Sequence, residues 1–174
     1  VDVTYLCNYS CNYCRWGSAK TPGRIHHPLD SILAKPGDLQ AMGIERVVLS
    51  GGEPLLHPQI IQIIEHYSLI VEDVILITNG WLAELDRIEE LISAGLTGLA
   101  FSIDSINETI LANTRDMTAP QMARTLTNFG AICESRSEGL LNLELGVNAV
   151  ISAENATVED VAELLNWAQV HNLD

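Results

Sequence analysis

Three cysteines lie close together near the start of the chain, at Cys7, Cys11 and Cys14. Thiolates at spacings of four and three residues can wrap one small metal cluster or a single ion. Three ligands to a four-iron cluster leave one iron open to a substrate, whereas a pure electron carrier uses four cysteines. A structural zinc site with His26 or His27 as fourth ligand is the alternative. The cysteine pattern therefore indicates a metal centre and leaves the metal open.

Two loops further along the chain carry groups suited to binding a ligand. Gly51 and Gly52 let a backbone approach a ligand closely, and Glu53 adds a carboxylate, so this loop suits an ammonium group. The second loop is the Thr-Asn-Gly sequence that begins at Thr78. Without a ligand, both sequences are ordinary turns, since paired glycines and Asn-Gly are common turn residues.

A third polar loop contains Ser102 and Asp104. These residues lie two positions apart, so their side chains project to the same side and can hold a diol such as a ribose. Alternatively, Asp104 or Ser105 caps a helix and needs no ligand. Each motif alone is weak. All of them follow successive predicted strands, however, and a single crevice at the carboxyl ends of those strands would collect them.

The elements that must position these loops alternate between strand and helix. The predicted strands are apolar segments rich in Val, Ile and Leu, at 1–6, 46–50, 73–78, 99–103 and 143–151. Helical spacing is seen at 60–67, 85–92, 122–132 and 158–170, and more weakly at 28–42, where Pro36 and Gly37 should break it. This order predicts right-handed βαβ units and a parallel α/β sheet. Periodicity leaves open a partial barrel, a full barrel or an open doubly wound sheet.

The last predicted strand alternates between two faces. Leu143 and Leu145 begin the apolar face, whereas Asn142, Glu144 and Asn148 fall on the other face. In a barrel, this second set of side chains would line the lumen.

Composition limits the class of protein. The 174 residues, 47% of them hydrophobic, suffice for one domain with its own core. The formal charge of −14 argues against binding to nucleic acid or to anionic lipid. No apolar run is long enough to cross a bilayer and no secretory leader is present, so we expect a cytoplasmic protein whose clustered cysteines bind metal. Because the sequence starts within a predicted strand, we expect a fragment of a longer protein.

Taken in order, the motifs resemble a known family. Cys-x₃-Cys-x₂-Cys, Gly-Gly-Glu-Pro, Thr-Asn-Gly and Ser-Ile-Asp-Ser together are similar to the radical S-adenosylmethionine (SAM) superfamily. The resemblance is strongest to the branch with the molybdenum-cofactor cyclase, NifB-type enzymes and SPASM/Twitch peptide-modifying enzymes. It implies a parallel-stranded partial TIM barrel of the (β/α)₆ type, truncated to about five βα units. Residues 1–174 would then form a single radical SAM core domain.

The resemblance also implies roles for individual residues. Cys7, Cys11 and Cys14 would bind a [4Fe-4S] cluster. The SAM-binding residues would be Tyr13 against the adenine, Gly51, Gly52 and Glu53 at the methionine amino group, Thr78, Ser102 and Asp104 around the ribose and methionine, and Asn148 on the pocket wall. Arg115 would either pair with the SAM carboxylate or face solvent on a helix. Asp116 stands where many relatives have glycine, and Cys133 reads as a packing residue.

The implied reaction is reductive cleavage of SAM to a 5′-deoxyadenosyl radical, which takes a hydrogen atom from a substrate. That substrate is a peptide or, alternatively, a small molecule of the kind used by the molybdenum-cofactor cyclase. The implied partner is a low-potential electron donor, flavodoxin or ferredoxin. A zinc-stabilised binding domain without a reaction is the alternative of a different class.

Overall fold

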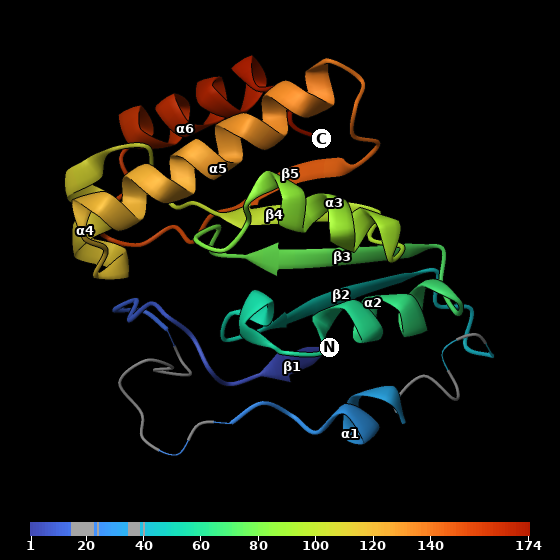
Figure 1. Ribbon diagram of the computed structural model, residues 1–174. Helices are drawn as coiled ribbons and strands as arrows, with labels where there is room; N and C mark the ends of the chain where they lie inside the picture. The colour runs from blue at the N-terminus through green and yellow to red at the C-terminus, as the bar shows by residue number, and fades with distance from the viewer. Residues whose placement is uncertain (15–22, 24, 35–38, 40) are drawn as a thin grey trace.

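Five parallel strands form one sheet whose spatial order follows the chain. The computed structural model describes residues 1–14, 23, 25–34, 39 and 41–174. The strands are β1 (Asp2–Thr4), β2 (Arg46–Gly51), β3 (Asp73–Thr78), β4 (Gly98–Ser102) and β5 (Glu144–Asn148). A doubly wound sheet reverses its strand order at a switch point, and this sheet does not. The structure therefore confirms the parallel α/β prediction and favours a partial barrel (Figure 1).

Helices connect the strands (Figure 1). They are α1 (Leu29–Leu33), the 3₁₀ turn η3 (Pro54–Leu56), α2 (Ile60–Ser68), α3 (Leu85–Ser93), α4 (Glu108–Arg115), α5 (Ala119–Ser137) and α6 (Val158–Val170). Thr157 caps α6 by accepting a hydrogen bond from the Asp160 N–H. α1 is shorter than the weak helix expected over 28–42, and Pro36 and Gly37 lie outside the described residues.

The sequence reading missed α4. Asn107 caps this helix, because its Oδ1 accepts the N–H groups of Thr109 and Ile110. The alternative that Asp104 or Ser105 caps a helix is therefore wrong. The helix is short and its apolar side chains are few, so it carries little of the periodicity that marks a longer helix.

The core lies between the sheet and its helices. Leu49, Leu76 and Phe101 project from three neighbouring strands and are fully buried. Phe101 meets Phe129 of α5 edge to face, with ring centroids 5.1 Å apart. The opposite face of the sheet is less covered, since Val48 of β2 remains 37% exposed. In this chain, a strand with a continuous apolar sequence can therefore leave one face of the sheet partly exposed.

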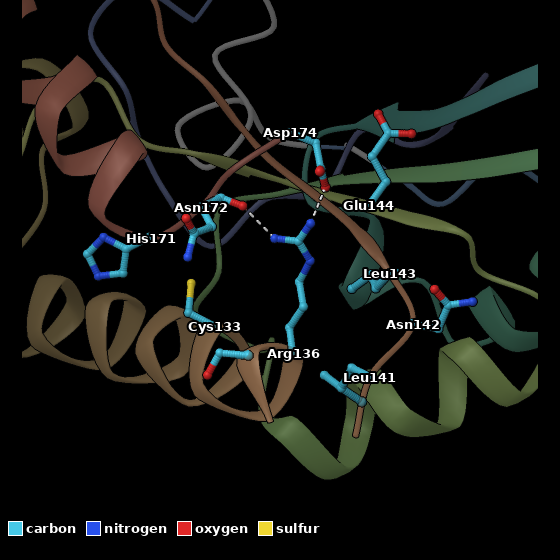
Figure 2. Close-up of a pocket in the computed structure, with 10 residues that line it drawn as sticks. Cys133, Arg136, Leu141, Asn142, Leu143, Glu144, His171, Asn172 and Asp174 are labelled. Carbon is cyan, nitrogen blue, oxygen red and sulfur yellow. Dashed lines mark hydrogen bonds and ion pairs between the residues drawn. The ribbon is translucent and has the colours of Figure 1, made fainter. Parts of the chain in front are cut away.

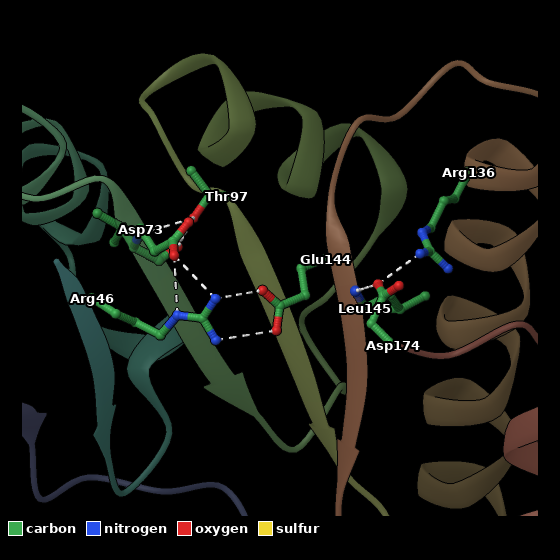
Figure 3. A network of polar contacts seen from close by, with 8 residues as sticks. Arg46, Asp73, Thr97, Arg136, Glu144, Leu145 and Asp174 are labelled. Atoms are coloured by element: carbon green, nitrogen blue, oxygen red, sulfur yellow. Dashed lines mark hydrogen bonds and ion pairs between the residues drawn. The ribbon is translucent and has the colours of Figure 1, made fainter.

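A network of ion pairs connects the amino ends of three strands (Figure 3). Arg46 of β2 contacts Asp73 of β3 and Glu144 of β5, each at 3.0 Å. Glu144 therefore lies at the edge opposite the strands' carboxyl ends. Asn142 precedes β5 and lines a separate cavity of about 860 Å³ with Cys133 and other residues (Figure 2). Of the three residues predicted to line a barrel lumen, only Asn148 lines the pocket at the carboxyl ends of the strands.

No helix in the part of the chain that the structure describes is long and apolar enough to cross a membrane.

Candidate functional site

A pocket of about 580 Å³ opens at the carboxyl ends of the strands. It collects the cysteine loop and the ends of β2, β3, β4 and β5, as the sequence predicts. Its lining residues are Cys7, Tyr9, Cys11, Tyr13, Cys14, Ser50, Gly51, Gly52, Ile77, Thr78, Asn79, Ser102, Arg115, Asn148, Ala149 and Val150. Two predicted ligand contacts, Glu53 and Asp104, are absent from this lining and lie buried behind it.

The cysteine loop is fastened to helices far along the chain. Tyr9 is buried, and its hydroxyl lies 3.0 Å from the Thr125 hydroxyl on α5. The Asn12 N–H donates to the carbonyl of Thr114 in α4 at 2.8 Å. A small apolar cluster around Tyr9 also contacts the side chains of Cys7 and Cys11. α4 and α5 thus hold the cysteine loop at the pocket that its three cysteines line.

The chemistry of these thiols fits a metal-bound group. Burial raises the pKa of Cys7 to about 11 and raises the pKa of Cys11 as well. Neutral thiols are poor ligands, and a coordinated cation is what deprotonates them. Among the described residues, no three His, Cys, Asp or Glu side chains close around a single ion position. The three cysteines line one pocket together, and thiolates of this kind are the ligands of iron–sulfur clusters.

The histidines considered as zinc ligands lie beside β1. The His26 Nδ1 is 3.0 Å from the Thr4 hydroxyl, and its ring packs edge to face on His57. The His27 ring packs on Tyr5, with centroids 4.5 Å apart. Neither His26 nor His27 lines the pocket with the cysteines.

Gly51 and Gly52 bring the end of β2 against the cysteine loop. The Gly52 N–H donates to the Thr4 carbonyl at 2.8 Å, and the Glu53 N–H donates to the Leu6 carbonyl at 2.7 Å. Gly51 has a φ of +139°, a conformation that side chains rarely adopt. A Cβ at Gly52 would lie 2.1 Å from the Leu6 carbonyl oxygen. The glycines are thus required by backbone packing, whether or not a ligand is bound.

We expect Gly52→Ala to lower the free energy of unfolding by about 1–3 kcal/mol, as other overpacked or strained sites do. The added methyl group meets backbone atoms, which can move only by pulling β1 and the cysteine loop away from β2. Urea denaturation of the full-length protein measures the change. Gly146→Ala is the control, because a Cβ at Gly146 of β5 meets no atom within 4 Å. Equal stabilities of the two variants would contradict the close approach.

Glu53 ties β2 to β3 behind the pocket. Its carboxylate accepts hydrogen bonds from the Leu55 N–H at 3.0 Å, the Thr78 hydroxyl at 2.8 Å and the Asn79 N–H at 2.7 Å. Complete burial nevertheless raises its pKa to about 7. All its described partners are donors of the protein itself, so the carboxylate positions the loop that begins at Thr78.

Asp104 connects four segments of the chain. Its carboxylate receives Arg115 in a bidentate pair at 2.6 and 2.7 Å and the Tyr13 hydroxyl at 2.5 Å. It also accepts the Val150 N–H, which follows β5, at 2.9 Å. Asn155 secures the same loop, since its Nδ2 donates to the Asp104 carbonyl at 2.8 Å. Asp104 therefore fixes the residues around the pocket and turns Tyr13 toward β4.

Arg115 is only 4% exposed and lines the pocket, so the alternative of a solvent-facing helical arginine is wrong. Its guanidinium carbon lies 5.8 Å from the centre of the Tyr13 ring. The next residue, Asp116, ends α4 in the left-handed conformation, with φ 52° and ψ 38°. Glycine adopts that conformation most easily, which explains why glycine is expected here, and aspartate is one of the few other residues that tolerate it.

The remaining sequence-predicted residues divide between the pocket and the packing layer. Thr78, Ser102 and Asn148 all line the pocket. Cys133 is half-buried on α5 against the core, as predicted for a packing residue, and burial raises its pKa to about 11. The sequence reading did not single out Tyr9 and Val150. Both lie next to recognised motifs, but only packing between distant segments brings them to the pocket.

Fold and site together define a class of protein: a parallel barrel-type α/β fold in which three cysteines line a pocket at the carboxyl ends of the strands. Residues 1–138 match the model of the Radical SAM superfamily. The chain belongs to that superfamily, whose enzymes use a [4Fe-4S] cluster and SAM and take electrons from a reductant.

Individual relatives agree with this assignment. A probable GTP 3′,8-cyclase of Methanocaldococcus jannaschii is 32% identical over 76% of this chain and 40% of its own length. A GTP 3′,8-cyclase of Clostridium perfringens is 28% identical over the whole chain and 52% of its own length. Streptococcus suis SuiB bound to SAM superposes with a TM-score of 0.78 at 16% identity, over 98% of this chain and 37% of SuiB. The chain thus spans about half or less of each of these proteins.

Proposed function

We propose that Cys7, Cys11 and Cys14 bind a [4Fe-4S] cluster and that the adjoining pocket binds SAM. One observation carries the proposal. The three cysteines share a single pocket with the carboxyl ends of four strands, although these residues are spread over most of the chain. Three protein thiolates leave one iron for a non-protein ligand.

The pocket residues would divide the contacts with SAM among them. The backbone at Gly51 and Gly52 offers close approach to the methionine amino group, and Arg115 offers a cation for its carboxylate. The remaining proposed contacts are Tyr13 with the adenine and Thr78, Ser102 and Asn148 with the ribose and methionine. Glu53 and Asp104, engaged by protein donors, would act by positioning these groups.

When bound, the cluster would supply one electron that cleaves SAM to a 5′-deoxyadenosyl radical, which takes a hydrogen atom from the substrate. The chain's own residues orient the ligand and limit the access of water. Tyr9, Ile77 and Val150 give the pocket an apolar wall, and none of them carries a charge. Such a wall limits the entry of water into the site.

Anaerobic reconstitution of the full-length protein with iron and sulfide tests this proposal. We expect brown protein with at least four irons per chain, and 5′-deoxyadenosine after SAM and dithionite are added. Colourless protein that retains zinc and leaves SAM intact would refute it, and would support the zinc-stabilised domain.

We also propose an electron donor, a location and a substrate for this enzyme. A flavodoxin or ferredoxin in the cytoplasm would reduce the centre. We favour a peptide as the hydrogen donor, because SuiB is also seen bound to the precursor peptide SuiA. The names of the relatives make GTP the alternative. The enzyme is incubated with SAM and either a candidate peptide or GTP. Mass spectrometry of the products then shows which of the two is modified.

A further inference from the structure

The side chain of Asn79 lies between the buried Glu53 and the cysteine loop. Asn79 follows β3 and is only 6% exposed. Its Nδ2 lies 3.8 Å from the Cys7 sulfur and 2.7 Å from the Asn8 Oδ1. Its Oδ1 accepts the Trp81 N–H at 3.1 Å. Because a backbone N–H can only donate, this bond fixes the amide orientation and directs the NH₂ group at Cys7.

The backbone of Asn79 is held from two sides. Its N–H donates to the Glu53 carboxylate at 2.7 Å, and its carbonyl accepts the Thr125 hydroxyl at 3.2 Å. The following Gly80 has a φ of +83° and its carbonyl accepts from Asn128 at 2.9 Å. The amide therefore does not need to reorganise in order to meet the sulfur.

We propose that Asn79 is a positioning residue that donates an N–H···S hydrogen bond to the Cys7 thiolate and thereby raises the reduction potential of the cluster. This inference rests on the proposed ligation by Cys7. A donor at a ligating sulfur stabilises negative charge, and the reduced cluster carries one more negative charge than the oxidised one. The Tyr9 N–H, 3.4 Å from the same sulfur, acts in the same direction.

Two substitutions test the inference with a readout other than turnover. Asn79→Ser keeps an oxygen near the Trp81 N–H but is too short to reach Cys7. Asn79→Asp keeps the shape but places a carboxylate oxygen where the amide donor was. In the full-length protein, reconstituted and titrated with dithionite without SAM, we expect the midpoint potential to become more negative in Asn79→Ser and most negative in Asn79→Asp. Electron paramagnetic resonance of the reduced centre follows the titration.

Asn8→Ala is the matched control, because it removes the other partner of the Asn79 amide, together with a long 4.0 Å contact to the Cys7 sulfur, and leaves the N–H···S bond in place. Its midpoint should stay close to that of the wild type. Unchanged midpoints in both Asn79 variants, or loss of iron from Asn79→Ser, would overturn the inference. A wild-type protein that binds no cluster would instead refute the proposed function.

Discussion

Replacing Cys11 by alanine is expected to abolish cluster binding and SAM cleavage together. The substitution leaves two of the three proposed thiolates, and two thiolates do not retain a cluster against loss to solution. Burial raises the pKa of Cys11, and the nearby Arg115 cation opposes part of that rise. Iron and sulfide content, the brown absorbance and 5′-deoxyadenosine production measure the result in the full-length protein.

Cys133→Ala is the control for this experiment, because Cys133 is the fourth cysteine and lies on α5, outside the pocket. It should keep iron, colour and SAM cleavage. If Cys11→Ala kept its iron, or if Cys133→Ala lost it, the ligand assignment would be wrong.

Asp104→Ala should lower the free energy of unfolding by about 3–5 kcal/mol, the range measured when one partner of a buried ion pair is removed. The substitution leaves the Arg115 guanidinium, only 4% exposed, without its bidentate partner. The Tyr13 hydroxyl and the Val150 N–H lose their acceptor as well. Urea denaturation measures the change, and weaker cluster retention should accompany it because Tyr13 lies between two proposed ligands.

Glu90→Ala provides the exposed comparison. Glu90 pairs with Arg87 at 2.6 Å on the surface of α3, and loss of such a pair costs less than about 1 kcal/mol. The double variant Asp104→Leu/Arg115→Met should recover part of the stability lost in Asp104→Ala, because no charge is left buried. If Asp104→Ala lowered the free energy of unfolding no more than Glu90→Ala does, the Asp104–Arg115 pair would not be desolvated.

The local sequence determined the order of elements, the parallel sheet and the edge at which the site lies. Apolar segments of strand length alternate with helical patterns, and each polar motif directly follows a strand. Parallel strands place their carboxyl ends together, so the cysteines, Gly51, Gly52, Thr78, Ser102 and Asn148 had to share one edge. These inferences need only neighbouring residues and the direction of the chain.

Only the tertiary structure decided which polar side chains face the pocket. Glu53 and Asp104 carry the carboxylates that the sequence motifs assign to a ligand, yet each is engaged by donors from other segments. Arg115 is buried because α4, itself unrecognised in the sequence, ends over Asp104. A buried charge needs a partner, and that partner is chosen by packing between segments distant in sequence. The local sequence pattern therefore does not predict which partner a buried charge has.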